Sequence, residues 1–125
     1  MNLNDIVNNF QNKSNYYGDF KNFEGEINAY RNKIQPMTDE QGNTFRHMAG
    51  SAAMTQKYNP ILTNILGTAK EVDDYFIKHK NGWDSLGDIK NNFIGSIVGQ
   101  KNKYMPRKSL YDLIFKDFIK WLLTI

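Results

Sequence analysis

The fold is decided by residues 44–54, which read Thr44-Phe45-Arg46-His47-Met48-Ala49-Gly50-Ser51-Ala52-Ala53-Met54. We predict that this stretch belongs to a helix running from Thr44 to Tyr58. Its central residues 50–53 carry only glycine, serine and alanine, so a second helix can approach their backbone closely. The helix opens on an arginine and a histidine, which its apolar pattern does not need. The stretch therefore predicts a tight helix–helix contact with polar residues at one end.

Outward from this helix, apolar residues recur at spacings of three and four, which is the period of an α-helix. On the N-terminal side we expect a short helix over 4–13, a break at 14–18, a helix over 19–34 that ends before Pro36, and a loop over 36–43. On the C-terminal side, after Asn59-Pro60, we expect helices over 61–80 and 85–98 and a last helix that begins near Pro106 or Ser109.

The predicted helix 85–98 begins after Asp84, which can act as its N-cap. Its expected core stripe consists of Leu86, Ile89, Phe93 and Ile97. No alternating run bounded by hairpin turns indicates a strand. The expected fold is a single compact all-α domain of five to six helices over residues 1–125, with a motif-bearing core at 42–99 and an amphipathic C-terminal helix at 107–125.

Composition excludes several classes of protein. The chain of 125 residues contains no cysteine, which excludes disulfides, thiol catalysis and thiolate zinc sites. No apolar run of membrane-spanning length is present, so we expect no transmembrane helix. The N-terminus lacks the basic and apolar regions of a signal peptide, which places the expected location in the host cytoplasm or a virion. The net charge of +3 is only mildly basic.

Polar residues gather in three segments of the expected core. Arg46 and His47 open one helix, Glu71 lies in the next, and Asp88, Asn91 and Asn92 lie in the third. The last three are spaced i, i+3 and i+4, so they share one helix face.

The order Arg46-His47, Glu71 and Asp88-x-x-Asn91-Asn92-x-x-Gly95 resembles uncharacterised helical domains of phage genomes and bacterial polymorphic toxins. The resemblance covers roughly residues 42–99. It departs at Lys70, where the family pattern has histidine, and this puts in doubt any proton transfer or metal binding by that histidine. The resemblance implies a phage or mobile-element origin and the location of a site, but it supplies no reaction.

The chemistry follows from the residue types. His47 beside a carboxylate, Glu71 or Asp88, can act as a general acid or base near neutral pH. Arg46 can hold an anionic group or a developing oxyanion, and Asn91 and Asn92 can position a substrate. This set favours hydrolase-like or lyase-type cleavage of a polar substrate. The resemblance to phage and toxin domains adds the cell envelope as an expected target. We expect no metal and no cofactor, because the motif lacks a second histidine.

The same residues also allow a purely structural interpretation. Arg46 can form a buried ion pair with Asp88 or Glu71, and the asparagines can satisfy backbone groups, since buried charges are normally paired. Neither interpretation is excluded by the sequence.

Two further segments suggest contact surfaces. The C-terminal helix carries Phe118 and Trp121 on an apolar face, which can close the core, contact a partner or lie at a membrane surface. The basic stretch with Lys101, Lys103 and Arg107 can hold nucleic-acid phosphates. The alternative function is therefore a non-enzymatic virion or host-interaction protein.

Overall fold

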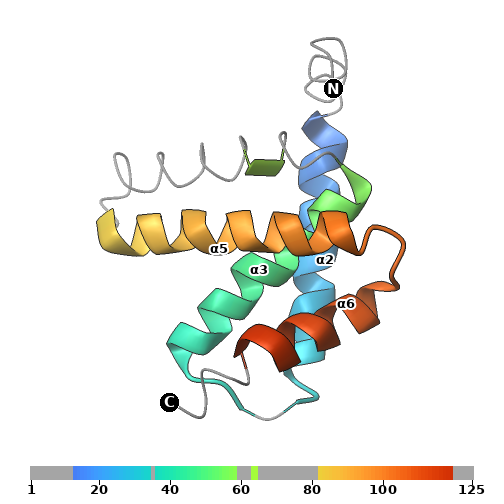
Figure 1. Ribbon diagram of the computed structural model, residues 1–125. Coiled ribbons are helices and arrows are strands. Elements are labelled where there is room, and N and C mark those ends of the chain that lie inside the picture. The colour runs from blue at the N-terminus through green and yellow to red at the C-terminus, as the bar shows by residue number, and fades with distance from the viewer. Residues whose placement is uncertain (1–12, 35, 59–62, 65–81, 120–125) are drawn as a thin grey trace.

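The computed structural model describes residues 13–34, 36–58, 63–64 and 82–119 (Figure 1). Four α-helices lie in these ranges, namely α2 (Lys13–Arg31), α3 (Asp39–Lys57), α5 (Gly82–Lys101) and α6 (Arg107–Ile114). A short π-helix, η1 (Phe115–Ile119), continues α6. The described residues contain no strand, which confirms the all-α prediction. The helices expected over 4–13 and 61–80 lie outside the described residues. Within the described part of the chain, no helix is long and apolar enough to cross a membrane.

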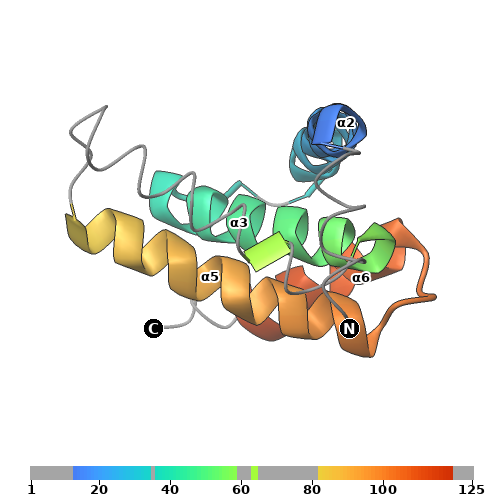
Figure 2. The same ribbon diagram turned by 90° about the horizontal axis from the view of Figure 1, so that it is seen from above.

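Helix α3 is the centre of the described structure. It packs along α5 and also contacts α2, α6 and η1 (Figures 1 and 2). It begins at Asp39 rather than at Thr44, so the loop predicted over 36–43 is wrong in its second half. The cause is a capping box, in which Gln41 donates its backbone N–H to the Thr38 side chain and the Gln41 side chain accepts from the Thr38 backbone N–H.

Two glycines of α5 allow it to lie against the backbone of α3. A Cβ atom added at Gly95 would lie 2.9 Å from Met48 Cα, and one added at Gly99 would lie 2.8 Å from Ala52 Cα. Both distances are shorter than real Cβ atoms show, so only glycine fits at either position. The predicted close approach to the small-sided segment 50–53 is confirmed, with α5 as the neighbour.

The expected core stripe of α5 is wrong. Leu86, Phe93 and Ile97 are 58%, 55% and 40% exposed, and Ile89 is only partly buried. Among residues 86–101 of α5, the buried ones are small or polar instead: Asp88, Gly95, Ser96 and Gly99. The physical reason is that close backbone contact with α3 selects the face that carries no bulky side chain. Hydrophobic periodicity identifies the apolar face of a helix, but it carries no information about contact between the backbones of two helices.

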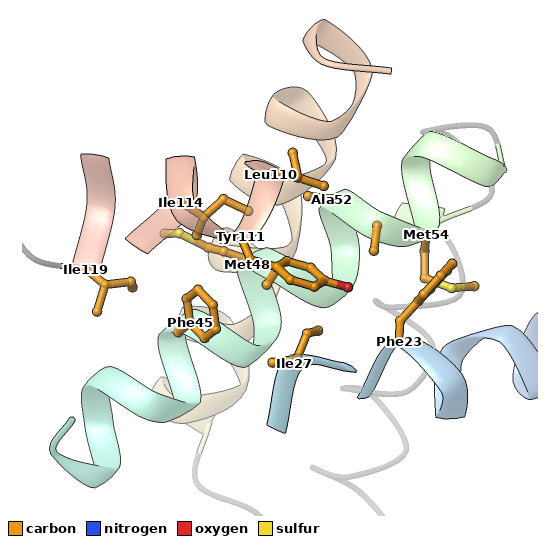
Figure 3. Close-up of a cluster of buried hydrophobic side chains, with 12 residues drawn as sticks. Phe23, Ile27, Phe45, Met48, Ala52, Met54, Leu110, Tyr111, Ile114 and Ile119 are labelled. Atoms are coloured by element: carbon orange, nitrogen blue, oxygen red, sulfur yellow. The ribbon is translucent and has the colours of Figure 1, made fainter. Parts of the chain in front are cut away.

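The apolar core lies among α2, α3, α6 and η1 (Figure 3). Its largest members are Phe23 and Ile27 of α2, Phe45, Met48 and Met54 of α3, Leu110, Tyr111 and Ile114 of α6, and Ile119 of η1. Helix α5 adds only partly buried apolar residues, Ile94 and Val98, to this cluster. Helix α3 therefore presents one side to the apolar core and another to α5.

Several helix boundaries differ from those expected. Helix α2 runs through residues 14–18, where a break was predicted, and ends at Arg31. Helix α5 is longer at both ends than the predicted 85–98, so Asp84 lies inside it and is not its N-cap. The last helix begins at Arg107, as predicted, but changes to a π-helix at Phe115. Residues 120–125 lie outside the described residues.

Candidate functional site

A histidine held between two residues of α5 forms the centre of the polar cluster. The Nε2 atom of His47 lies 3.3 Å from Asp88 Oδ2, and its Nδ1 atom lies 3.0 Å from Asn92 Oδ1. Asp88 and Asn92 are one helical turn apart, so both reach the same imidazole ring. The Asp88 side chain is only 4% exposed, whereas that of His47 is 12% exposed. The imidazole ring therefore lies between a buried carboxylate and the protein surface.

The second carboxylate oxygen of Asp88 is also hydrogen-bonded. Asn43 donates its side-chain amide to Asp88 Oδ1 over 3.0 Å, and Arg46 Nη2 donates to Asn43 Oδ1 over 2.9 Å. Asn43 and His47 are one turn apart on α3, so they approach the carboxylate together. The buried Asp88 carboxylate thus pairs with the imidazole through one oxygen and accepts a hydrogen bond from the Asn43 amide through the other, as a buried carboxylate requires.

A serine fixes the two helices next to this network. Ser51, one turn beyond His47, donates its hydroxyl hydrogen to the backbone carbonyl oxygen of Asn92 over 2.5 Å. On α5, the Ser96 hydroxyl donates to the Phe93 carbonyl oxygen over 2.7 Å. Asn43, His47 and Ser51 recur every four residues and form one polar edge of α3. This edge sets the position of α3 along α5, and the glycine contacts set how closely the helices approach.

The geometry assigns different roles to the two ring nitrogens of His47. Nε2 faces a carboxylate that can only accept, so the proton on Nε2 is retained whether the ring is neutral or charged. Nδ1 faces the side-chain amide of Asn92. This amide can accept a hydrogen bond from a charged ring through its oxygen or, with its O and N positions exchanged, donate one to a neutral ring. Asp88 therefore orients the ring through Nε2, and Asn92 faces Nδ1.

Not all of the predicted site residues meet at this ring. His47, Asp88 and Asn92 do. Arg46 is exposed and bonds Asn43. Of the two ion pairs that the sequence left open for Arg46, the one with Asp88 does not form in the described residues, where Asp88 lies against His47. Asn91 is partly buried and has no hydrogen bond to another described side chain. Glu71 and Lys70 lie outside the described residues.

Sequence reasoning missed two members of the network. Asn43 was placed in a loop although it begins the polar segment 43–47, and Ser51 was expected on the His47 face of the helix only as a small neighbour. Their spacing of four from His47 is the signal that could have identified them, because residues four apart share a helix face. That signal becomes readable only once the helix is known to begin before Asn43.

The residues expected to contact partners are arranged differently. Phe118 packs against the apolar core, and Trp121 lies outside the described residues. Lys101 and Lys103 are exposed. Arg107 instead bonds a carboxylate of α2, with its Nε 2.7 Å from Glu26 Oε1.

In the described ranges, no three histidine, aspartate or glutamate side chains are grouped so that they could hold a metal ion. Comparison of the chain with protein-family models, with curated proteins and with solved structures finds no match.

Proposed function

We propose that the protein is a small helical acid–base enzyme of the hydrolase type, encoded by a phage or mobile element and directed at the cell envelope. The observation that carries the proposal is the arrangement of Asp88, His47 and Asn92, in which a buried carboxylate orients an imidazole whose other nitrogen faces an amide. An aspartate that holds a histidine in one tautomer and stabilises its charged form is a recurring part of hydrolytic sites. Origin and target rest on the resemblance alone.

In this proposal His47 takes a proton at Nδ1 from a water molecule or substrate hydroxyl. The Asp88 carboxylate stabilises the imidazolium that forms and keeps the ring oriented. The Asn92 side chain turns from the ring to the substrate. Arg46, exposed and bonded through Nη2 to Asn43, is available to hold an anionic group of the substrate.

The test is the release of soluble fragments from purified bacterial cell walls. We expect His47→Gln to lower the rate by about 100-fold or more, since positioned acid–base groups contribute factors of this size. The matched control is His79→Gln, which removes the other histidine and should leave the rate unchanged. Activity that survives His47→Gln in full would exclude the acid–base role. A wild-type protein inactive on cell walls but active on another polar substrate would exclude only the proposed target.

A second candidate is self-assembly as a non-enzymatic virion protein. The observation that favours it is the exposed apolar row Leu86, Phe93 and Ile97 on the outer face of α5. Exposed apolar rows of this kind mark interaction surfaces, and a second copy of the chain would bury the same row on both partners. In this reading the His47–Asp88 network only connects α3 to α5. We would measure the mass in solution by light scattering: a dimer or larger assembly that Phe93→Ser converts to monomer supports this candidate, and a wild-type monomer rejects it.

A further inference from the structure

An open pocket of about 620 Å³ lies between the C-terminal half of α2 and the start of α6. Its volume falls within the range of sites for small molecules, about 300–1,000 Å³. The residues that define it include Glu26 and Tyr30 of α2, Lys33 in the turn after α2, and Arg107, Lys108 and Tyr111 of α6. The pocket is distinct from the His47 cluster. Phe45 of α3 contacts the pocket residue Tyr30, whereas His47, two positions on, faces α5.

The pocket walls carry more positive than negative charge. Three cations, Lys33, Arg107 and Lys108, face one carboxylate, that of Glu26. Glu26 binds Arg107 through Nε, and the guanidinium stacks over the Phe23 ring with its carbon 4.9 Å from the ring centroid. These two contacts hold the guanidinium in place. Its terminal nitrogens have no hydrogen bond to another described residue, and no described carboxylate lies within ion-pair distance of either lysine.

The floor of the pocket consists of two fixed aromatic rings. Tyr111 is buried and donates its hydroxyl hydrogen to Glu26 Oε1 over 2.8 Å, while Tyr30 donates to Asp112 Oδ1 over 2.5 Å. Burial, reinforced by the neighbouring carboxylates, raises the pKa of both phenols, so both remain neutral donors at physiological pH. The Tyr30 ring stacks on Phe45 with centroids 5.6 Å apart. Both tyrosine side chains are therefore held in place by hydrogen bonds and are themselves uncharged.

We infer that this pocket binds a small phosphomonoester, with its phosphate among Arg107, Lys33 and Lys108 and its apolar part against the partly exposed ring of Tyr30. A guanidinium with free terminal nitrogens matches the paired oxygens of a phosphate, and two lysines add charge without fixed geometry. The partly exposed ring of Tyr30 favours an organic phosphate over the inorganic ion, because the inorganic ion leaves that ring uncovered.

Isothermal titration calorimetry with phenyl phosphate and with inorganic phosphate tests the inference, together with amide chemical shifts recorded by NMR. We expect phenyl phosphate to bind more tightly than phosphate and to shift residues 26–33 and 106–111. The double variant Lys33→Gln/Lys108→Gln should raise the Kd for phenyl phosphate by about tenfold or more, the loss expected from two charge-assisted contacts. The matched control, Lys101→Gln/Lys103→Gln, removes the same charge from an exposed stretch and should change the Kd by less than about twofold.

A wild-type Kd for phenyl phosphate above about 10 mM, which corresponds to less than 3 kcal/mol of binding, would overturn the inference. Equal weakening of binding by both double variants would also overturn it, because it would show attraction by net charge alone. The third contrary result is binding of a single-stranded oligonucleotide that the control variant abolishes, which would assign the phosphate contacts to residues 101–103. Thermal unfolding checks that the pocket variant is folded. If it is not, Lys108→Gln alone and the map of shifted amides provide the same decision. None of these outcomes depends on whether His47 is catalytic.

Discussion

Replacing Gly95 by alanine should push α5 away from α3. The added Cβ atom would lie 2.9 Å from Met48 Cα and closer still to the Met48 carbonyl oxygen, whereas ordinary contact begins at 3.4 Å. The contact with the carbonyl oxygen would be about 1 Å shorter than ordinary contact, so the helices must separate by about 1 Å. The obstacle is backbone, which cannot rotate aside as a side chain can. Overpacking of this kind costs about 1–3 kcal/mol, and backbone obstruction places Gly95 at the upper end.

Helix propensity acts in the opposite direction, because alanine in place of glycine stabilises a helix interior by up to about 1 kcal/mol. The net effect expected of Gly95→Ala is therefore a loss of about 2 kcal/mol, or a fall in Tm of roughly 6–10 °C for a chain of this length. Gly87→Ala is the matched control on the same helix, since a Cβ there meets nothing within 4 Å. It should raise the Tm by a few degrees, through about 0.5–1 kcal/mol of propensity.

Thermal unfolding of the two variants, followed by circular dichroism, measures both effects. The reasoning requires the two shifts to have opposite signs. If Gly95→Ala unfolds at the same temperature as Gly87→Ala, or at a higher one, the backbones of α3 and α5 are not in contact at this point. The separation of the helices should also lengthen the Ser51–Asn92 hydrogen bond, so faster amide hydrogen exchange in α5 of Gly95→Ala provides a second readout.

Three more predictions follow from single contacts. Asp88→Asn should cost about 3 kcal/mol in urea unfolding because it removes the buried partner of the imidazole, whereas Arg46→Gln should change stability by less than about 0.5 kcal/mol because that side chain is exposed. Thr38→Ala should cost about 1 kcal/mol through loss of the capping box, seen as a lower urea midpoint with an unchanged slope. The pKa of Glu26 is lowered: burial alone would raise it, but hydrogen bonds from the guanidinium and phenol of α6 outweigh burial. Its stabilising effect is therefore present above the unfolded-state pKa of about 4.3 and is lost as pH falls through the lower folded-state pKa, so below pH 4.3 the wild type should lose more stability than Glu26→Gln.

The sequence could predict those features of the fold that follow from the periodicity of the α-helix. Arg46 and His47 were expected at the start of a helix with a small-sided centre, and Asp88 and Asn92 on one face of another. Because residues four apart share a face, the two segments could be expected to meet once the helices packed. The structure brings His47, Asp88 and Asn92 together. The start of α3 could also have been read from Thr38-x-x-Gln41, but Pro36 and Gly42 nearby favoured a loop.

The part that sequence could not predict is the orientation of α5. This helix has two candidate faces, an apolar one with Leu86, Phe93 and Ile97 and a small or polar one with Asp88 and Gly95. Burial of apolar area favours the first. In the structure the small or polar face packs against α3, because a glycine allows the two backbones to come into van der Waals contact. The dispersion energy of this contact is not included in any scale of side-chain hydrophobicity. The choice between the two depends on the partner surface, which is a tertiary property.

Burial of Asp88 at this contact also determines which experiment separates a catalytic cluster from a structural one. Loss of Asp88 or His47 should destabilise the protein under either reading, because each would remove a partner of the other within the α3–α5 contact. Arg46 is different, since it is exposed and bonds only Asn43 among the described residues. If the cluster merely joins two helices, Arg46→Gln should be silent in both stability and activity. If the cluster is a site for an anionic substrate, the same variant should lose activity while its Tm is unchanged, and only catalysis or binding produces that combination.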